Sequence, residues 1–132
     1  MNKESLALHT GVDIIEIERV ARAYRRRPQL FLQRFFTAQE QEQLAARSYG
    51  ARHLAARFAA KEAVFKLLGC GLGSIAWTDV EIISLPSGQP TVCLRGRAKL
   101  RAAKLSLHSI ALSLSHSRNY AVAQAVALAM TK

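Results

Sequence analysis

Residues from about 51 to 68 form the longest helical pattern in the chain, and most of its positions are apolar. Gly69 follows directly, in the place where a glycine in the left-handed conformation commonly closes a helix. A helix of this composition needs other elements to cover it, because its apolar side chains must leave water. The segment therefore predicts a long helix with a sheet packed against it.

One charged residue interrupts the apolar surface of this helix. Phe58, Glu62 and Phe65 are spaced i, i+4 and i+7, so they lie on one stripe. A carboxylate among aromatic rings is costly unless its charge is compensated. Lys66, one turn further on, offers a salt bridge, and the alternative is a metal ion or a phosphate-binding site. The stretch by itself leaves both interpretations open.

Helices are also expected in the first half of the chain. A strand over 6–14, ending at Asp13, precedes a helix over 15–27, and the apolar segment 28–36 packs on the core. Thr37 begins a capping-box pattern and predicts a helix of about ten residues.

Strands dominate the second half of the expected order. Two short strands, 80–85 and 91–94, are joined by a turn, and a basic helix follows over 97–107. Alternating residues over 110–117 and 120–128 predict an antiparallel pair. The whole order predicts one α+β domain over residues 1–132, with a mostly antiparallel sheet packed on the long helix.

Composition and charge narrow the class of partner. Half of the 132 residues are hydrophobic, and the net charge is +10, which favours nucleic acid, an acidic protein or a phosphorylated small molecule. The first residues lack the pattern of a secretory signal, and no apolar run is long enough to span a membrane. Cys70 and Cys93 match no metal spacing and are interpreted as free thiols in a reducing cytoplasm.

Three arginines, Arg19, Arg22 and Arg26, form a basic stripe on the helix expected over 15–27. Such a stripe is either a solvated face or a docking surface. Nucleic acid is disfavoured as the partner, because Glu16 and Glu18 stand in the same segment and no aromatic residues are interleaved for base stacking.

The glycines at positions 69, 71 and 73 do not form a standard phosphate loop. In such loops the glycines precede a helix, whose N-terminus faces the phosphate, whereas here they follow one. Gly69 is interpreted as a helix cap, and for Gly71 and Gly73 close approach to a ligand remains open.

Asp13 and Glu62 come from separate elements, and together with Lys66 they could form a site for Mg²⁺ and a diphosphate. Mg²⁺ prefers oxygen ligands and commonly takes only one or two carboxylates beside substrate phosphates. The alternative for Asp13 is a helix N-cap. His116, between two serines, is equally compatible with a structural and a catalytic role.

Six segments, taken in order, resemble the short bacterial 4′-phosphopantetheinyl transferases, the holo-acyl-carrier-protein synthases. They are GVDIIEIERV (11–20), RFFTAQE (34–40), ARFAAKEAVFKLLGCG (56–71), WTDVEI (77–82), SGQP (87–90) and SLSHSRNYAVAQAV (113–126). The resemblance runs from about residue 9 to residue 128. It implies the fold of that family and its reaction, in which the 4′-phosphopantetheine arm of coenzyme A moves to a serine of apo acyl-carrier protein.

The resemblance also implies a cofactor and a set of site residues. Mg²⁺ would be held by Asp13 and Glu62. Our own hypothesis is that Glu62, or a metal-bound water held by it, takes the serine proton. The catalytic residues would be Glu62, Lys66 and His116. The residues implied in coenzyme A binding are Arg57, Lys66, Gly69, Gly88, Gln89, Pro90, His116 and Ser117.

The implied assembly is a homotrimer with sites between subunits, and the implied docking surface for the acidic carrier protein is Arg19, Arg22, Arg26 and Arg34. Gln89 stands where the family usually has lysine, so one cationic contact to the coenzyme A phosphates is either missing or supplied by another residue. Two alternatives remain open: an enzyme dedicated to a carrier protein of secondary metabolism, and a non-enzymatic basic adaptor on the same fold.

Overall fold

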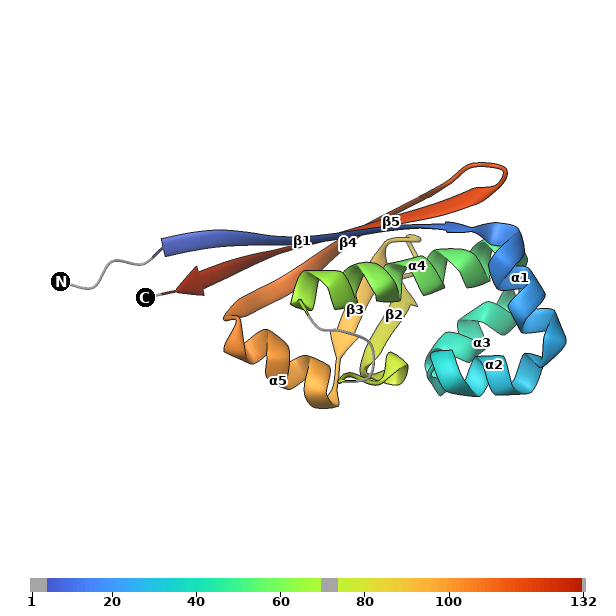
Figure 1. The fold of residues 1–132 in the computed structure, drawn as a ribbon, viewed down its shortest axis with the longest axis horizontal. Coiled ribbons are helices and arrows are strands. Elements are labelled where there is room, and N and C mark those ends of the chain that lie inside the picture. Colours follow the sequence, from blue (N-terminus) through green and yellow to red (C-terminus); the bar gives the residue numbers. More distant parts are fainter. Residues whose placement is uncertain (1–4, 70–73, 132) are drawn as a thin grey trace.

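A three-stranded antiparallel sheet and the long helix beneath it organise the computed structural model, which describes residues 5–69 and 74–131 (Figure 1). The sheet has the order β1-β5-β4, and a separate hairpin is formed by β2 and β3. The strands are β1 (Ser5–Glu16), β2 (Val80–Ser84), β3 (Pro90–Leu94), β4 (Leu107–His116) and β5 (Tyr120–Thr131). The α+β class and the mostly antiparallel pairing are confirmed.

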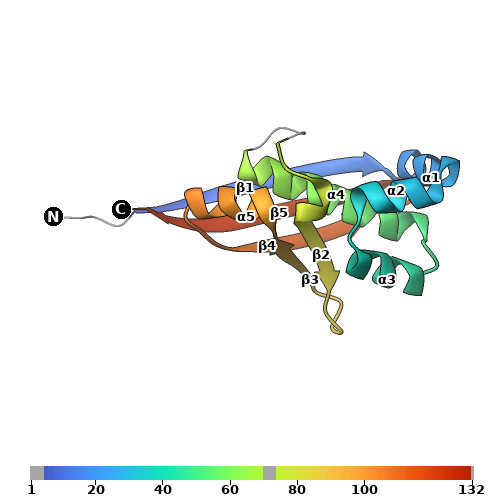
Figure 2. The ribbon, with the colours of Figure 1, turned by 90° about the horizontal axis from the view of Figure 1, so that it is seen from below.

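The helices are α1 (Ile17–Arg26), α2 (Pro28–Phe35), α3 (Ala38–Ala46), α4 (Ala51–Leu68) and α5 (Gly96–Lys104), with a 3-10 turn η1 (Trp77–Asp79) before β2. Helix α4 runs along the middle of the sheet's inner face, with α5 towards one end and α1, α2 and α3 towards the other (Figure 2). No helix in the described parts of the chain is long and apolar enough to cross a membrane.

Local signals explain where two of the helices begin or end. The Thr37 hydroxyl accepts from the Glu40 amide and the Glu40 carboxylate accepts from the Thr37 amide, so the predicted capping box is present. Gly69 takes the left-handed conformation, with φ of 69°, and closes α4 as expected.

Some predicted boundaries were wrong. The first strand does not end at Asp13: β1 continues to Glu16, because it stays paired with β5 as far as Tyr120. Asp13 therefore lies inside a strand and is not a helix N-cap. The first helix occupies only Ile17–Arg26, and residues 28–35 form a helix of their own that begins at Pro28. The basic helix ends at Lys104, after which Ser106 takes a positive φ of 58°.

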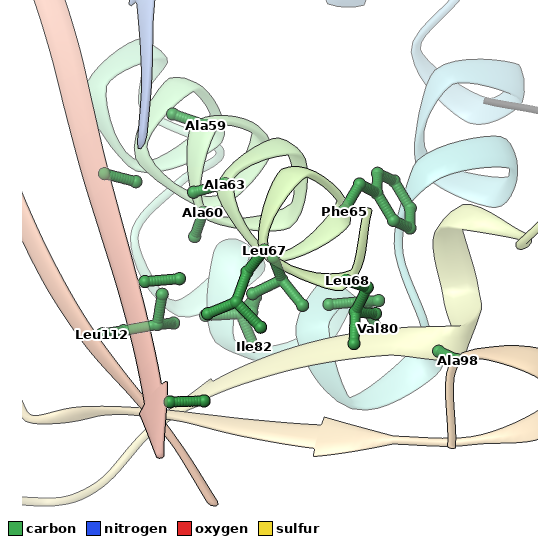
Figure 3. Packing of buried hydrophobic residues seen from close by; sticks show 14 of the residues in the cluster. Ala59, Ala60, Ala63, Phe65, Leu67, Leu68, Val80, Ile82, Ala98 and Leu112 are labelled. Carbon is green, nitrogen blue, oxygen red and sulfur yellow. The ribbon is translucent and has the colours of Figure 1, made fainter. Parts of the chain in front are cut away.

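The sheet packs closely on α4 because its inner face is made of small residues. On β5 the residues at every second position are alanines, and Ala121, Ala123, Ala125, Ala127 and Ala129 are all buried. Larger side chains fill the space between α4 and the hairpin, where Leu67, Ile82 and Leu112 converge (Figure 3).

Gly11 marks the closest approach of β1 to α4. A Cβ atom placed there would lie 1.9 Å from the Ala63 carbonyl oxygen and 2.7 Å from the Leu67 amide nitrogen. Both neighbours are helix backbone, which cannot rotate away. Gly11 therefore sets the distance between the strand that carries Asp13 and the helix that carries Glu62.

Replacing Gly11 with alanine is expected to lower the free energy of unfolding by about 3 kcal/mol, because strand and helix must separate to admit the methyl group. Urea denaturation measures this. Gly50→Ala is the control, since a Cβ there meets its nearest neighbours at 3.3 Å. Equal effects of the two substitutions would contradict the close-packing argument.

Candidate active site

Asp13 and Lys66 join β1 to α4 at the centre of the site. The Lys66 Nζ lies 3.1 Å from Asp13 Oδ1 and donates to the Val12 carbonyl oxygen at 3.0 Å. The Asp13 side chain is only 10% exposed, whereas that of Lys66 is 56% exposed. The amine of Lys66 therefore lies at the surface and remains accessible to a ligand, while the Asp13 carboxylate is buried beside it.

Glu62 lies one turn before Lys66 on α4 and is half-buried. Burial raises the pKa of its carboxyl, and the nearby charge of Asp13 raises it further, while Lys66 and Arg19 act in the opposite direction. The structure thus brings the two predicted carboxylates together with Lys66.

The proposed salt bridge between Glu62 and Lys66 is not what the structure shows. Within the described residues, the ion pair of Lys66 is with Asp13, and Glu62 has none within 4.0 Å. The reason is the packing of β1 on α4, which places the buried carboxylate of Asp13 beside the Lys66 amine. Asp13 therefore pairs with Lys66 in place of Glu62, which lies on the same helix.

Two hollows meet at Glu62 and are called here the Glu62 cleft. One, of about 340 Å³, is lined by Asp13 and Arg19, and the other, of about 770 Å³, by Trp77, Arg34 and Arg97. Phe35, Phe58 and Glu62 line both hollows. A carboxylate at the junction of two cavities is accessible from both.

Aromatic rings form the wall of the Glu62 cleft. Trp77 stacks on Phe58, with ring centroids 4.8 Å apart, and meets Phe35 and Phe65 edge to face, each at 5.0 Å. These geometries are favourable for aromatic pairs. The wall is apolar and strengthens the electrostatic effect of any charge placed at Glu62.

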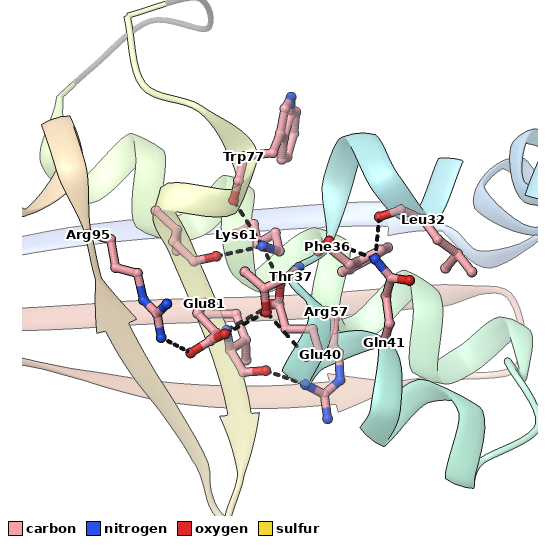
Figure 4. A network of polar contacts seen from close by, with 12 residues as sticks. Leu32, Phe36, Thr37, Glu40, Gln41, Arg57, Lys61, Trp77, Glu81 and Arg95 are labelled. Atoms are coloured by element: carbon pink, nitrogen blue, oxygen red, sulfur yellow. Dashed lines mark hydrogen bonds and ion pairs between the residues drawn. The ribbon is translucent and has the colours of Figure 1, made fainter. Parts of the chain in front are cut away.

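A buried polar network behind this wall was missed by sequence reasoning (Figure 4). Lys61 is fully buried, and its Nζ lies 2.8 Å from Glu40 Oε1. The same amine donates to the carbonyl oxygens of Trp77 at 2.9 Å and Val80 at 2.5 Å. Lys61 therefore ties the backbone of Trp77 to α4, next to Glu62. The sequence feature that could have identified Lys61 is its position directly before Glu62, among apolar neighbours.

Glu40 joins this network to the hairpin. Its second carboxylate oxygen accepts from the Ile82 amide at 2.8 Å. Thr37 donates to Glu81, and Arg95 donates to the other oxygen of Glu81 at 2.9 Å. Glu40, which the sequence predicted only as part of a capping box, thus links α3 to both α4 and β2.

A second group of predicted residues lies away from the Glu62 cleft. Arg57 and Gly88 line a separate hollow of about 570 Å³ that contains neither Asp13 nor Glu62. The Arg57 guanidinium is already bonded to the Ile82 carbonyl oxygen and to Gln43 Oε1, the latter at 2.6 Å. Gln89 and Pro90 line a further hollow between β3, α5 and β4.

His53, which the sequence did not single out, also faces the hollow of Arg57. Burial lowers its pKa, and the positive charges of Arg47, Arg52 and Arg57, together with His116, lower it further. His116 is exposed at the end of β4, close enough to affect His53. The Ser117 hydroxyl accepts from the Tyr120 amide at 3.1 Å and holds the β4–β5 turn.

The predicted docking arginines are exposed, as expected for a contact surface. Arg19, Arg22 and Arg26 are exposed on α1, and Arg34 is exposed near the end of α2. Arg19 and Arg34 also line the two halves of the Glu62 cleft. Cys70, Gly71 and Gly73 lie outside the described residues.

The donor set at Asp13 and Glu62 fits Mg²⁺. Both donors are hard carboxylate oxygens, and their proximity raises the pKa of Glu62, so a cation would relieve their repulsion. Among the described residues, no group of three or more His, Cys, Asp or Glu side chains could hold a metal. Two carboxylates suit an ion that keeps water and substrate oxygens as its other ligands.

Residues 9–125 match the model of the 4′-phosphopantetheinyl transferase superfamily, and the chain belongs to that family. Its relatives include the holo-[acyl-carrier-protein] synthases. That of Moorella thermoacetica is 48% identical over 119 residues, covering 90% of this chain and 92% of that protein. That of Caldanaerobacter subterraneus is 42% identical over 123 residues, covering 93% and 96%.

Solved structures agree with this assignment. The Helicobacter pylori holo-[acyl-carrier-protein] synthase in complex with coenzyme A matches with a TM-score of 0.79 at 28% identity, covering 89% of this chain and 98% of that one. The family resemblance stated from sequence motifs is confirmed.

Proposed function

We propose that this chain transfers the 4′-phosphopantetheine group of coenzyme A to a serine of an apo acyl-carrier protein, releasing adenosine 3′,5′-bisphosphate. The observation that carries the proposal is the meeting of Asp13 and Glu62 at an aromatic cleft, with Lys66 paired to Asp13, in a chain of this family. Holo-[acyl-carrier-protein] synthases among its relatives and a relative bound to coenzyme A support the substrates.

The reaction requires one bond to form and one to break. The serine oxygen attacks the phosphorus that carries the pantetheine arm, and the bond from that phosphorus to the bridging oxygen of the diphosphate breaks. The bridging oxygen leaves on adenosine 3′,5′-bisphosphate, where negative charge develops. Lys66, as a cation at the edge of the site, stabilises this charge.

Glu62 is proposed to accept the serine proton, directly or through a water. Glu62 lines both halves of the cleft, so its carboxylate is accessible to an incoming hydroxyl group and can act as a general base. Asp13 and Glu62 would hold Mg²⁺, which when bound withdraws charge from the diphosphate oxygens.

The test is a product balance by liquid chromatography. Purified chain, coenzyme A, Mg²⁺ and apo acyl-carrier protein should yield one adenosine 3′,5′-bisphosphate for each coenzyme A consumed and each carrier protein modified. Consumption of coenzyme A with release of free phosphopantetheine would indicate a hydrolase and contradict the proposal.

We further propose a homotrimer. The outer face of the sheet exposes Leu6, Leu8, Val12 and Ile14 of β1, each more than half exposed, and no described element covers it. A neighbouring copy would bury this face. It could also bring the residues around Arg57, Gly88 and His116 to the Glu62 cleft of the next subunit. Light scattering at assay concentration gives the mass that tests this.

The reaction is proposed to belong to fatty acid biosynthesis in the cytoplasm, without nucleic acid or membrane as partner. Cys93 supports a reducing compartment, because it is exposed and free.

The exposed arginines of α1 are proposed to dock the acidic carrier protein. Arg19→Glu is expected to raise the KM for carrier protein about tenfold at low salt, with the KM for coenzyme A nearly unchanged, because it reverses a charge beside the cleft. Steady-state kinetics with each substrate varied in turn measure both constants. An equal rise in the two constants would count against the docking role.

A further inference from the structure

Helix α5 presents a second basic surface. It contains no acidic residue, and Arg97, Leu100, Arg101 and Lys104 follow the spacing that places side chains on one face. This set is called the α5 face. Leu100 is 66% exposed, and Arg97 and Lys104 are also exposed. An exposed leucine among cations is suited to an acidic surface that carries an apolar residue.

The α5 face is held firmly against the central helix. Arg101 Nε donates to the Leu68 carbonyl oxygen at 2.9 Å, at the C-terminal end of α4. The cation also stabilises that end of the helix dipole. The remaining members of the face therefore have a fixed position relative to Glu62 and Lys66, which lie on the same helix.

The α5 face is continuous with the Glu62 cleft. Its four residues line a hollow of about 240 Å³ together with Ser74 and Ile75. Arg97, Ser74 and Ile75 also line the larger half of the Glu62 cleft. Arg34, which belongs to α2, also lines that half, and α2 and α5 both contact η1, which lies between them (Figure 1). The cleft is thus bordered by cations from two elements.

We propose that the α5 face is a second docking surface for the acidic carrier protein, additional to the arginines of α1. The inference rests on the proposed function, in which a protein must bring a serine to Glu62. A carrier protein that places its serine in the Glu62 cleft lies between α1 and α5 and can contact both helices. An anionic membrane fits less well, since Leu100 is the one large apolar side chain exposed on this face among the described residues.

The test compares one substitution at two places on α5. Lys104→Glu reverses a charge on the α5 face, and Lys99→Glu makes the same change where the helix lines the hollow beside β3 and β4. We expect Lys104→Glu, and likewise Arg97→Glu, to raise the KM for carrier protein about threefold at low ionic strength. For Lys104→Glu, which lines neither half of the Glu62 cleft, the kcat should be unchanged and the effect should shrink with added salt, and Lys99→Glu should leave the KM for carrier protein as it is.

Each other outcome overturns the inference. An equal rise with Lys99→Glu would show an effect of total charge alone. Unchanged kinetics in Lys104→Glu and Arg97→Glu, while the wild-type chain transfers normally, would remove the second surface and leave the proposed function intact. A wild-type chain that transfers nothing would overturn both. Phosphatidylglycerol vesicles bound by the wild type but not by Lys104→Glu, with the KM unchanged, would reassign the face to a membrane.

Discussion

Glu62→Gln is expected to lower kcat by at least a hundredfold while leaving the fold at least as stable as the wild type. The loss follows because an amide cannot accept the serine proton and is a poorer ligand for Mg²⁺. Stability should be kept because the amide removes a charge that burial and Asp13 both disfavour. Transfer kinetics and urea denaturation at neutral pH measure the two effects.

Glu42→Gln provides the matched control for this substitution. Glu42 is exposed on α3 and lines neither half of the Glu62 cleft. The Glu42→Gln variant should therefore have the kcat of the wild-type chain. A Glu62→Gln variant that turned over at the wild-type rate would exclude Glu62 as proton acceptor, and one that unfolded would show a structural role instead.

Lys61→Met is expected to lower the free energy of unfolding by about 3–5 kcal/mol, because it leaves the buried Glu40 carboxylate without its cation. The carbonyl groups of Trp77 and Val80 lose a donor at the same time. Trp77 is the single tryptophan of the chain, so its fluorescence during urea denaturation reports both unfolding and the state of the cleft wall.

A second substitution separates the charge effect from lost packing. Glu40→Gln keeps a side chain that supports the capping box, since glutamine serves at that position as glutamate does. The double variant Lys61→Met with Glu40→Gln should therefore be more stable than Lys61→Met alone. If the single variant lost less than about 1 kcal/mol, or the double variant lost more, the uncompensated-charge argument would be contradicted.

The sequence predicted those parts of the fold that depend on local chemistry. Thr37 and Glu40 identified a helix start, Gly69 a helix end, and the alternation over 120–128 a strand with one buried face. Each signal arises from contacts within a few residues. The boundary of β1 was wrong because its last residues are kept extended by pairing with β5, a contact distant in sequence.

In the site, too, features set by local contacts could be predicted, whereas features set by contacts distant in sequence could not. Glu62 stands out because a carboxylate interrupts an apolar helical stripe, and the oxygen ligands that Mg²⁺ prefers indicate Asp13 as its partner. The partner of Lys66 could not be predicted, since it depends on the strand–helix approach at Gly11. Lys61 was missed because its compensating carboxylate comes from α3, and Arg97 because its place beside the cleft depends on the packing of α5 against η1 and α4.

The measurement that tests the central claim most directly is the intact mass of an apo acyl-carrier protein after incubation with coenzyme A, Mg²⁺ and this chain. With the wild-type chain, the carrier protein should gain the mass of one phosphopantetheine group. The gain should disappear with EDTA and with Asp13→Asn. No gain on any of several carrier proteins from a folded wild-type chain, or an equal gain with Asp13→Asn in EDTA, would contradict a metal-assisted transfer at Asp13 and Glu62.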